Sequence, residues 1–312
     1  PTVDLFRQTL FARRGKGHPF PRRRFRTVTE TAPHITLATR KSPLALKQAE
    51  LAAEALKGSM GAEVELLPLS TTGDRQLEWS LEQEGGKGLF TKELETALLE
   101  GRADLAVHSA KDMPTDMPTG LALAGYLPRE DPRDMLVFRE EIDVPRVIAT
   151  GSPRRRSQLS ERFPEVEWKE IRGNVGTRLR KIAEDHEADA TVLAAAGLKR
   201  LGIDSFPGLG FKPFAVDDMV PAPGQAAIAL QVREEDVERF RVACDPSTFE
   251  QVDLERSLLE ALGGGCQVAI GAHLRGDEFF VFHGDKGRCS VNVSGLSVAE
   301  AVELALNALN EA

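Results

Sequence analysis

The fold class follows from one stretch near the N-terminus, HITLATRKSPLAL (residues 34–46). Apolar Ile35 and Leu37 alternate with polar neighbours, and this period of two predicts a short strand. Ser42 followed by Pro43 is typical of a helix N-cap with proline in the first turn, and apolar residues then recur at helical spacing. The stretch therefore predicts a strand, a turn and a helix, which is the repeating unit of an α/β protein.

The same unit recurs along the chain. Strands are expected at residues 64–69, 104–108, 146–150, 166–171 and 226–232, helices at 89–100 and after 153 and 174, and a strand-and-helix unit at 190–201. Pro-rich segments at 128–132 and 221–224 indicate two chain crossings. From about Pro246 the pattern changes to a helix, a glycine turn, three short strands and a terminal helix at 298–309. We therefore expect two α/β halves with helices on both sheet faces, followed by a small α+β part.

Composition excludes several classes of protein. The chain has 312 residues, of which 41% are hydrophobic and 28% charged, enough to bury cores in two or three domains. No apolar run approaches the ~20 residues that cross a bilayer. Three cysteines do not make a disulfide scaffold, so a reducing, cytoplasmic location is expected. The spacing of Cys and His predicts no metal site.

Charge divides the chain at about residue 34. Residues 1–34 carry eight basic and two acidic side chains, whereas the remaining residues carry 32 basic and 46 acidic ones. A body this acidic is a poor nucleic-acid binder. The basic extension has no apolar segment of a secretory signal, and it is interpreted as a disordered tail or a misassigned start. The alternative is a transit peptide, which would place the protein in an organelle stroma or matrix.

Basic residues gather where strands are expected to pass into helices. Arg154-Arg155-Arg156 opens one helix, Arg172 and Arg178 flank the start of another, and Arg40 follows the first strand. Helix N-termini favour anions, and guanidinium groups bind carboxylates or phosphates through paired hydrogen bonds. A solvated charged helix face is the simpler interpretation of a single run. Clusters at equivalent strand ends favour an anion site instead.

A second candidate is the segment VHSAKDMP (residues 107–114), again at the end of an expected strand. His108, Ser109 and Asp112 contain the residue types of a hydrolase triad, but residues so close in sequence seldom adopt triad geometry. Asp112 beside Lys111 is better interpreted as a carboxylate kept ionised by cations. Such a group can stabilise a developing positive charge or exchange a proton with a nitrogen atom.

The third candidate is Cys266, which follows three glycines (residues 263–265). A thiol on so flexible a loop is accessible, and it is a candidate for covalent attachment. The usual interpretation of a cysteine, a buried and inert thiol, suits Cys244 and Cys289 better.

Together these segments closely resemble the porphobilinogen deaminase family. The motifs that carry the resemblance, in order, are ATRKSPLAL (38–46), GGKGLFTKELE (85–95), DLAVHSAKDMP (104–114), REDPRD (129–134), RGNVGTRL (172–179), LAAAGLKRLG (193–202) and GGGCQVAIG (263–271). The resemblance implies two α/β domains resembling periplasmic binding proteins, crossed twice by the chain, and a small C-terminal domain with a three-stranded antiparallel sheet. The implied boundaries are 1–34 for the extension, 35–128 with 224–243 for domain 1, 129–223 for domain 2, and 246–312 for the cofactor-attachment domain.

The resemblance also implies roles for individual residues. Asp112 would be the catalytic carboxylate, and Cys266 would hold a dipyrromethane cofactor through a thioether. The residues implied to bind carboxylates of cofactor and substrate are Arg40, Ser42, Lys111, Thr150, Ser152, Arg154, Arg155, Arg172, Asn174, Arg178 and Gln225. Asp74, Lys87 and Phe90 would belong to an active-site loop. Gly151 and Gln83 depart from the pattern, because many relatives have Ser and Lys there.

The implied activity is that of a transferase in tetrapyrrole synthesis. Asp112 would assist loss of ammonia from porphobilinogen, and four rings would be added in turn to the dipyrromethane before hydrolysis releases hydroxymethylbilane. A monomer acting on this small substrate, without nucleic acid or membrane, is expected. The rival interpretation is a two-lobed anion-binding protein without catalysis, which explains the arginines but neither Asp112 nor the Gly-Gly-Gly-Cys266 loop.

Overall fold

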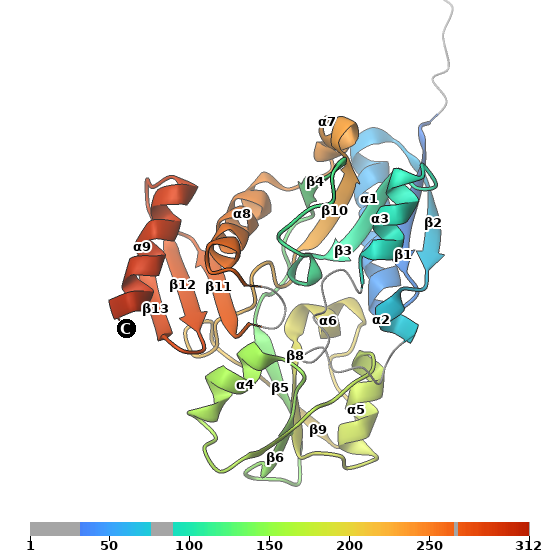
Figure 1. Ribbon diagram of the computed structural model, residues 1–312. Helices are drawn as coiled ribbons and strands as arrows, with labels where there is room; N and C mark the ends of the chain where they lie inside the picture. The colour runs from blue at the N-terminus through green and yellow to red at the C-terminus, as the bar shows by residue number, and fades with distance from the viewer. Residues whose placement is uncertain (1–31, 76–89, 265–267, 312) are drawn as a thin grey trace, which may run out of the picture. The chain divides into compact units, whose positions relative to one another are not determined.

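The computed structural model describes residues 32–75, 90–264 and 268–311, without the side chains of residues 74 and 75. Within these residues the chain forms two five-stranded sheets and one three-stranded antiparallel sheet, each packed against helices (Figure 1). The mixed α/β class predicted from the sequence is confirmed. In the described segments, no helix is long and apolar enough to cross a membrane.

The first sheet has the strand order β2-β1-β3-β10-β4. Its strands are β1 (His34–Arg40), β2 (Glu63–Leu69), β3 (Leu105–Ser109), β4 (Leu121–Tyr126) and β10 (Ile228–Arg233). β1 is parallel to β2 and β3, and β10 is antiparallel to β3 and β4. Helices α1 (Pro43–Met60) and α7 (Val237–Arg241) pack on the face that carries Leu37, while α3 (Lys92–Leu99) packs on the opposite face with Ala38.

The second sheet has the strand order β7-β6-β8-β5-β9. Its strands are β5 (Asp134–Arg139), β6 (Val147–Ala149), β7 (Glu167–Lys169), β8 (Ala190–Ala194) and β9 (Leu209–Pro213). β6 is parallel to β7 and β8, and β5 is antiparallel to β8 and β9. Helices α5 (Val175–Ala183) and α6 (Ala195–Arg200) contribute to one core, and α4 (Pro153–Ser160) contributes to the other.

The chain passes between these two sheets twice, from β4 to β5 and from β9 back to β10. The two crossing segments are bonded to each other, because Nε of Arg129 donates to the Gln225 carbonyl at 3.0 Å. Ala226, in the second crossing, has a φ of 73°, a left-handed conformation that costs free energy in a residue with a side chain. Its carbonyl accepts a hydrogen bond from Nη2 of Arg200, which holds this turn in place.

The C-terminal part of the chain has a sheet and a hydrophobic core of its own. It comprises α8 (Pro246–Ala261), β11 (Ile270–Arg275), β12 (Glu278–His283), β13 (Gly287–Asn292) and α9 (Val298–Glu311). Leu258 of α8, Phe279 of β12 and Ala305 of α9 meet in one core, so both helices pack on the three-stranded sheet. Asp245 caps α8 by accepting from the Thr248 N–H at 2.7 Å.

Three strands were not predicted from the sequence, namely β4, β5 and β9. Their periodicity is weak, since β4 contains Gly125 and β9 contains Gly210 and Pro213. The glycine in β9 makes room for a neighbour on β5, because a Cβ at Gly210 would lie 2.8 Å from Cε2 of Phe138. These strands are therefore stabilised by pairing with neighbouring strands, because their own sequence pattern is weak. The predicted helix at 89–100 is shorter than expected and begins at Lys92.

Candidate functional site

An open pocket lies where β1 and β3 end and α1 begins. Four of the predicted site residues, Arg40, Ser42, Phe90 and Asp112, line it together. The other lining residues are Leu44, Ala45, Gln48, Thr91, Val107, His108 and Ser109. The pocket therefore combines a cation, an anion, hydroxyl groups and an aromatic ring.

The cationic side of this pocket is Arg40, the last residue of β1. Its Cζ lies 4.2 Å from the centroid of the Phe90 ring, so the guanidinium makes a cation–π contact. Ser42 caps α1, because its Oγ accepts from the Ala45 N–H at 3.3 Å. The N-terminus of α1 thus opens at the pocket and adds its positive dipole end beside Arg40.

The anionic side is Asp112, which follows β3 in the 3₁₀ turn Ala110–Asp112. The side chain is partly buried. Burial lowers the pKa of Lys111 and of Arg178, and the charge of Asp112 partly opposes this lowering, so Asp112 stands within electrostatic reach of both cations. The nearby His108 is neutral above about pH 4, because burial and, to a lesser degree, the charge of Arg40 lower its pKa to about 4. Asp112 therefore faces surroundings that are mainly positive.

The hydrolase interpretation of this segment is not supported by the geometry. Ser109 exchanges hydrogen bonds with the Gln48 amide, whose Nε2 donates to the serine Oγ at 2.9 Å. Nε2 of His108 lies 3.0 Å from Oε1 of Gln231. The serine and the histidine thus bind other partners, and the histidine does not act as a base towards the serine.

A second group of predicted residues surrounds a buried carboxylate, Asp134 at the start of β5. Its Oδ2 accepts from Nη1 of Arg154 at 2.7 Å, and its Oδ1 accepts from Nε and Nη2 of Arg155 at 3.0 and 2.8 Å. Gln225 donates to the same Oδ1 at 3.1 Å and accepts from Nζ of Lys111 at 3.2 Å. The two arginine charges lower the pKa of Asp134 although burial alone would raise it. Asp134 thus connects α4, through Gln225, to the turn that carries Asp112.

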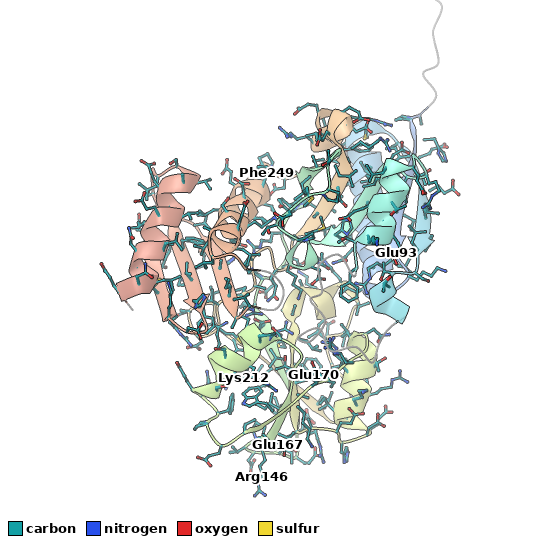
Figure 2. The ribbon with its side chains drawn as sticks, in the orientation of Figure 1. Glu93, Arg146, Glu167, Glu170, Lys212 and Phe249 are labelled. Atoms are coloured by element: carbon teal, nitrogen blue, oxygen red, sulfur yellow. The ribbon has the colours of Figure 1, made fainter. Side chains whose placement is uncertain are left out.

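The third group lies at the start of α5. Asn174 caps this helix, with its Oδ1 accepting from the Thr177 N–H at 2.9 Å. Nε of Arg178 donates to the Gly173 carbonyl at 2.8 Å, and Nη2 of Arg172 donates to Oε1 of Glu170 at 2.9 Å (Glu170 is labelled in Figure 2). Nε of Arg172 is buried and has no hydrogen-bond partner within the described part of the chain. A buried N–H of this kind needs an acceptor, which a ligand carboxylate would provide.

Thr150 and Ser152 shape the start of α4. Thr150 is buried, and its Oγ1 accepts from the Ser152 N–H at 3.2 Å. The Ser152 Oγ in turn caps the helix by accepting from the Arg155 N–H at 3.4 Å. These residues hold the turn from which Arg154 and Arg155 extend.

The cations of the second and third groups act on each other electrostatically. Burial, followed by the charge of Arg155, lowers the pKa of Lys111 to about 8. Burial, followed by Arg155 and Arg172, lowers the pKa of Arg178 to about 10. These shifts mean that the cations are partly desolvated and repel one another. Anionic ligand groups would relieve this repulsion, so the arrangement favours binding of several carboxylates.

Some predicted residues lie outside the described part of the chain, namely Lys87, Cys266 and the side chain of Asp74. Asp134, which ends the motif REDPRD, was not predicted as a site residue. Because the strand that begins at this residue was not predicted, nothing in the sequence alone placed its carboxylate beside Arg154 and Arg155.

The chain is an α/β protein whose described residues gather cations suited to a small molecule with several carboxylates. A family model described as "Porphobilinogen deaminase, dipyromethane cofactor binding domain" matches residues 35–240. The chain belongs to the porphobilinogen deaminase family, and it contains the domain that binds the dipyrromethane cofactor. Membership supports a transferase role in tetrapyrrole synthesis.

Several solved structures are similar to this chain at low identity. The periplasmic VFT2 domain of Bordetella pertussis BvgS matches 68% of this chain and 84% of its own, with 18% identity and a TM-score of 0.41. YhfZ from Shigella flexneri matches 73% of this chain and 96% of its own, with 16% identity and a TM-score of 0.35. Prephenate dehydratase from Arthrobacter aurescens, in complex with L-Phe, matches 64% of this chain and 60% of its own, with 13% identity and a TM-score of 0.37.

Proposed function

We propose that this chain is a hydroxymethylbilane synthase. It would condense four molecules of porphobilinogen, with loss of ammonia, onto a dipyrromethane held by Cys266, and then release the linear tetrapyrrole by hydrolysis. The observation that carries the proposal is the pocket shared by Arg40 and Asp112, in a chain that contains the family's cofactor-binding domain. A passive anion site has no use for a carboxylate at this position, since Asp112 would repel the ligand.

The described residues fit a ligand made of dicarboxylic pyrroles. Lys111 and Arg178 are desolvated cations that an anion would stabilise, and the buried Nε–H of Arg172 needs an acceptor. Arg40 presents a further cation at the pocket. These groups would hold acetate and propionate side chains by charge-assisted hydrogen bonds. The polar caps Ser42, Thr150, Ser152 and Asn174, together with Gln225, are proposed to hold and supplement this set.

Asp112 is proposed as the catalytic residue. As ammonia leaves the aminomethyl group of porphobilinogen, positive charge develops on the pyrrole nitrogen, and a carboxylate beside it lowers the energy of that state. Surrounding cations would bind the ring through its own carboxylates. When bound, the dipyrromethane would supply the pyrrole carbon to which the first new ring is joined. Asp74, Lys87 and Phe90 are proposed to contribute to the same site from the adjoining loop.

We further propose the three-domain division 35–128 with 224–243, 129–223, and 246–312, with the first two resembling periplasmic binding proteins and the chain acting as a monomer. Separate hydrophobic cores around Leu37, Leu179 and Leu258 support the division. The cytoplasm is the proposed location.

The test begins with the purified chain and porphobilinogen. Consumption of porphobilinogen with release of ammonia is expected, whereas a protein that only binds anions would leave it unconsumed. Intact-protein mass spectrometry should show the added mass of a dipyrromethane, located on the peptide that contains Cys266. Cys266→Ala should lose this mass, and the matched variant Cys244→Ala should keep it. Active enzyme with an unmodified Cys266 would contradict the proposed covalent attachment.

A further inference from the structure

Gly73 lies in the short helix α2 (Thr72–Arg75), where nothing in its backbone requires glycine. Its φ is not positive, so a side chain could adopt the same conformation. Alanine is also favoured over glycine at helical positions. The glycine is therefore explained by the space around it rather than by its conformation.

That space is filled by the ring of Phe90. A Cβ placed on Gly73 would lie 2.6 Å from Cδ1 and 2.8 Å from Cζ of Phe90, and closer still to Cε1. Real Cβ atoms do not approach a ring so closely, so a methyl group here must displace either the ring or the backbone of α2.

The backbone of α2 is held near the ring. Oγ1 of Thr72 donates to Oε1 of Glu93 at 2.8 Å, which ties α2 to the first turn of α3 (Glu93 is labelled in Figure 2). Phe90 stands just before Thr91, the N-cap of the same helix. Helix α2 is bonded to the start of α3, and Phe90 directly precedes that helix. A side chain at position 73 would therefore displace the Phe90 ring more easily than it would separate α2 from α3.

The Phe90 ring is also in contact with Arg40, whose Cζ lies 4.2 Å from its centroid. Both side chains line the pocket that contains Asp112. An arginine has several rotatable bonds, and a fixed ring against its guanidinium limits the directions in which the donors point. Displacing the ring would therefore loosen the arginine.

We propose that Gly73 is a positioning residue that seats Phe90 against Arg40 and so orients the guanidinium towards a substrate carboxylate. That the carboxylate belongs to a pyrrole rests on the proposed function. The seating itself rests only on the contacts of Gly73, Phe90 and Arg40.

The first test measures the accessibility of Arg40 without any activity assay. Phenylglyoxal labels guanidinium groups, and peptide mass mapping gives the labelling rate of Arg40. Gly73→Ala should raise this rate at least about threefold, since it removes a contact of cation–π strength. Gly58→Ala is the matched control, because Gly58 is an exposed residue of α1 with no atom within 4 Å of its Cβ position. Equal labelling rates in the two variants would overturn the proposal.

The second test is a double-mutant cycle on the KM for porphobilinogen. Gly73→Ala alone should raise KM by about 2- to 30-fold with a smaller change in kcat, the range that corresponds to loss of a cation–π contact. In a Phe90→Leu background, where the ring is absent, the same substitution should change KM by less than about 1.5-fold. Independent, multiplying effects would show that Gly73 acts by another route. Porphobilinogen consumption by the unsubstituted chain tests the proposed function separately, so failure of either idea is recognised on its own.

Discussion

Glu255 offers the sharpest prediction on stability, because its carboxylate is fully buried and connects α8 to three other segments. Oε1 accepts from Nη1 of Arg129 at 2.7 Å and from the Leu274 N–H at 3.0 Å, and it lies 3.1 Å from Nδ1 of His273. Oε2 accepts from Nη2 of Arg129 at 2.9 Å and from the Gly224 N–H at 2.7 Å. Glu255→Gln removes the charge at nearly constant shape and places an amide NH₂ against some of these donors.

Two routes give a similar magnitude for this loss. Burial alone raises the pKa of Glu255, but the Arg129 charge and the bonds from His273 and Arg129 lower it from 4.5 to about 2. Since a change of one in pKa corresponds to about 1.4 kcal/mol, the ionised carboxylate contributes about 3 kcal/mol to folding. Removing one partner of a buried ion pair independently costs about 3–5 kcal/mol. We therefore expect Glu255→Gln to lower the free energy of unfolding by about 3–5 kcal/mol at pH 7.

The assay is urea unfolding of the holoenzyme, followed by far-UV circular dichroism between pH 7 and pH 2. A depressed carboxyl pKa stabilises the fold above pH 4.5, and this contribution is lost as the pH falls towards 2. Between pH 7 and pH 2, Glu255→Gln should therefore lose less of its free energy of unfolding than the unsubstituted chain does. Glu50→Gln is the control, because its pair with Lys47 is exposed and should be worth less than about 1 kcal/mol. A loss below about 1 kcal/mol in Glu255→Gln would show that the buried carboxylate contributes no more to stability than an exposed ion pair.

Three further outcomes concern the site. Asp112→Asn should lower kcat by at least ~10²-fold and change KM less, while Asp112→Glu retains more activity; near-normal turnover of the Asn variant would assign the charge stabilisation to another group. KM for porphobilinogen should rise as the pH passes about 8, because Lys111 then loses the charge that binds a carboxylate, and Lys111→Arg should remove this rise. A KM that does not change between pH 7 and pH 9 would contradict this role of the Lys111 charge. Arg155→Leu should both weaken ligand binding and lower stability, since Asp134 loses two of its bonds, and a variant with unchanged thermal unfolding would show that this ion pair contributes little.

Local sequence rules predicted the elements whose signals are local. The cap Ser42 with Pro43 is confirmed at α1, and the same pattern at Ser152 and Pro153 is confirmed at α4. Such signals are read from the sequence because one side chain satisfies backbone groups only three residues away. The weak strands β4, β5 and β9 were missed because their stability comes from neighbouring strands far away in sequence.

The residues of the candidate site also fall into those that the sequence predicted and those whose partners are known only from the fold. The family motifs and the polar residues at the ends of parallel strands, including Arg40 and Asp112, were predicted from the sequence, because the order of elements along the chain sets which residues follow each strand. The contact of the Asp134 carboxylate with Arg154 and Arg155, and that of Gly73 with the Phe90 ring, depend on the tertiary structure. These contacts join residues from different elements, and burial removes the water that would otherwise solvate the charges. Their partners and pKa shifts are therefore properties of the folded chain rather than of any segment of it.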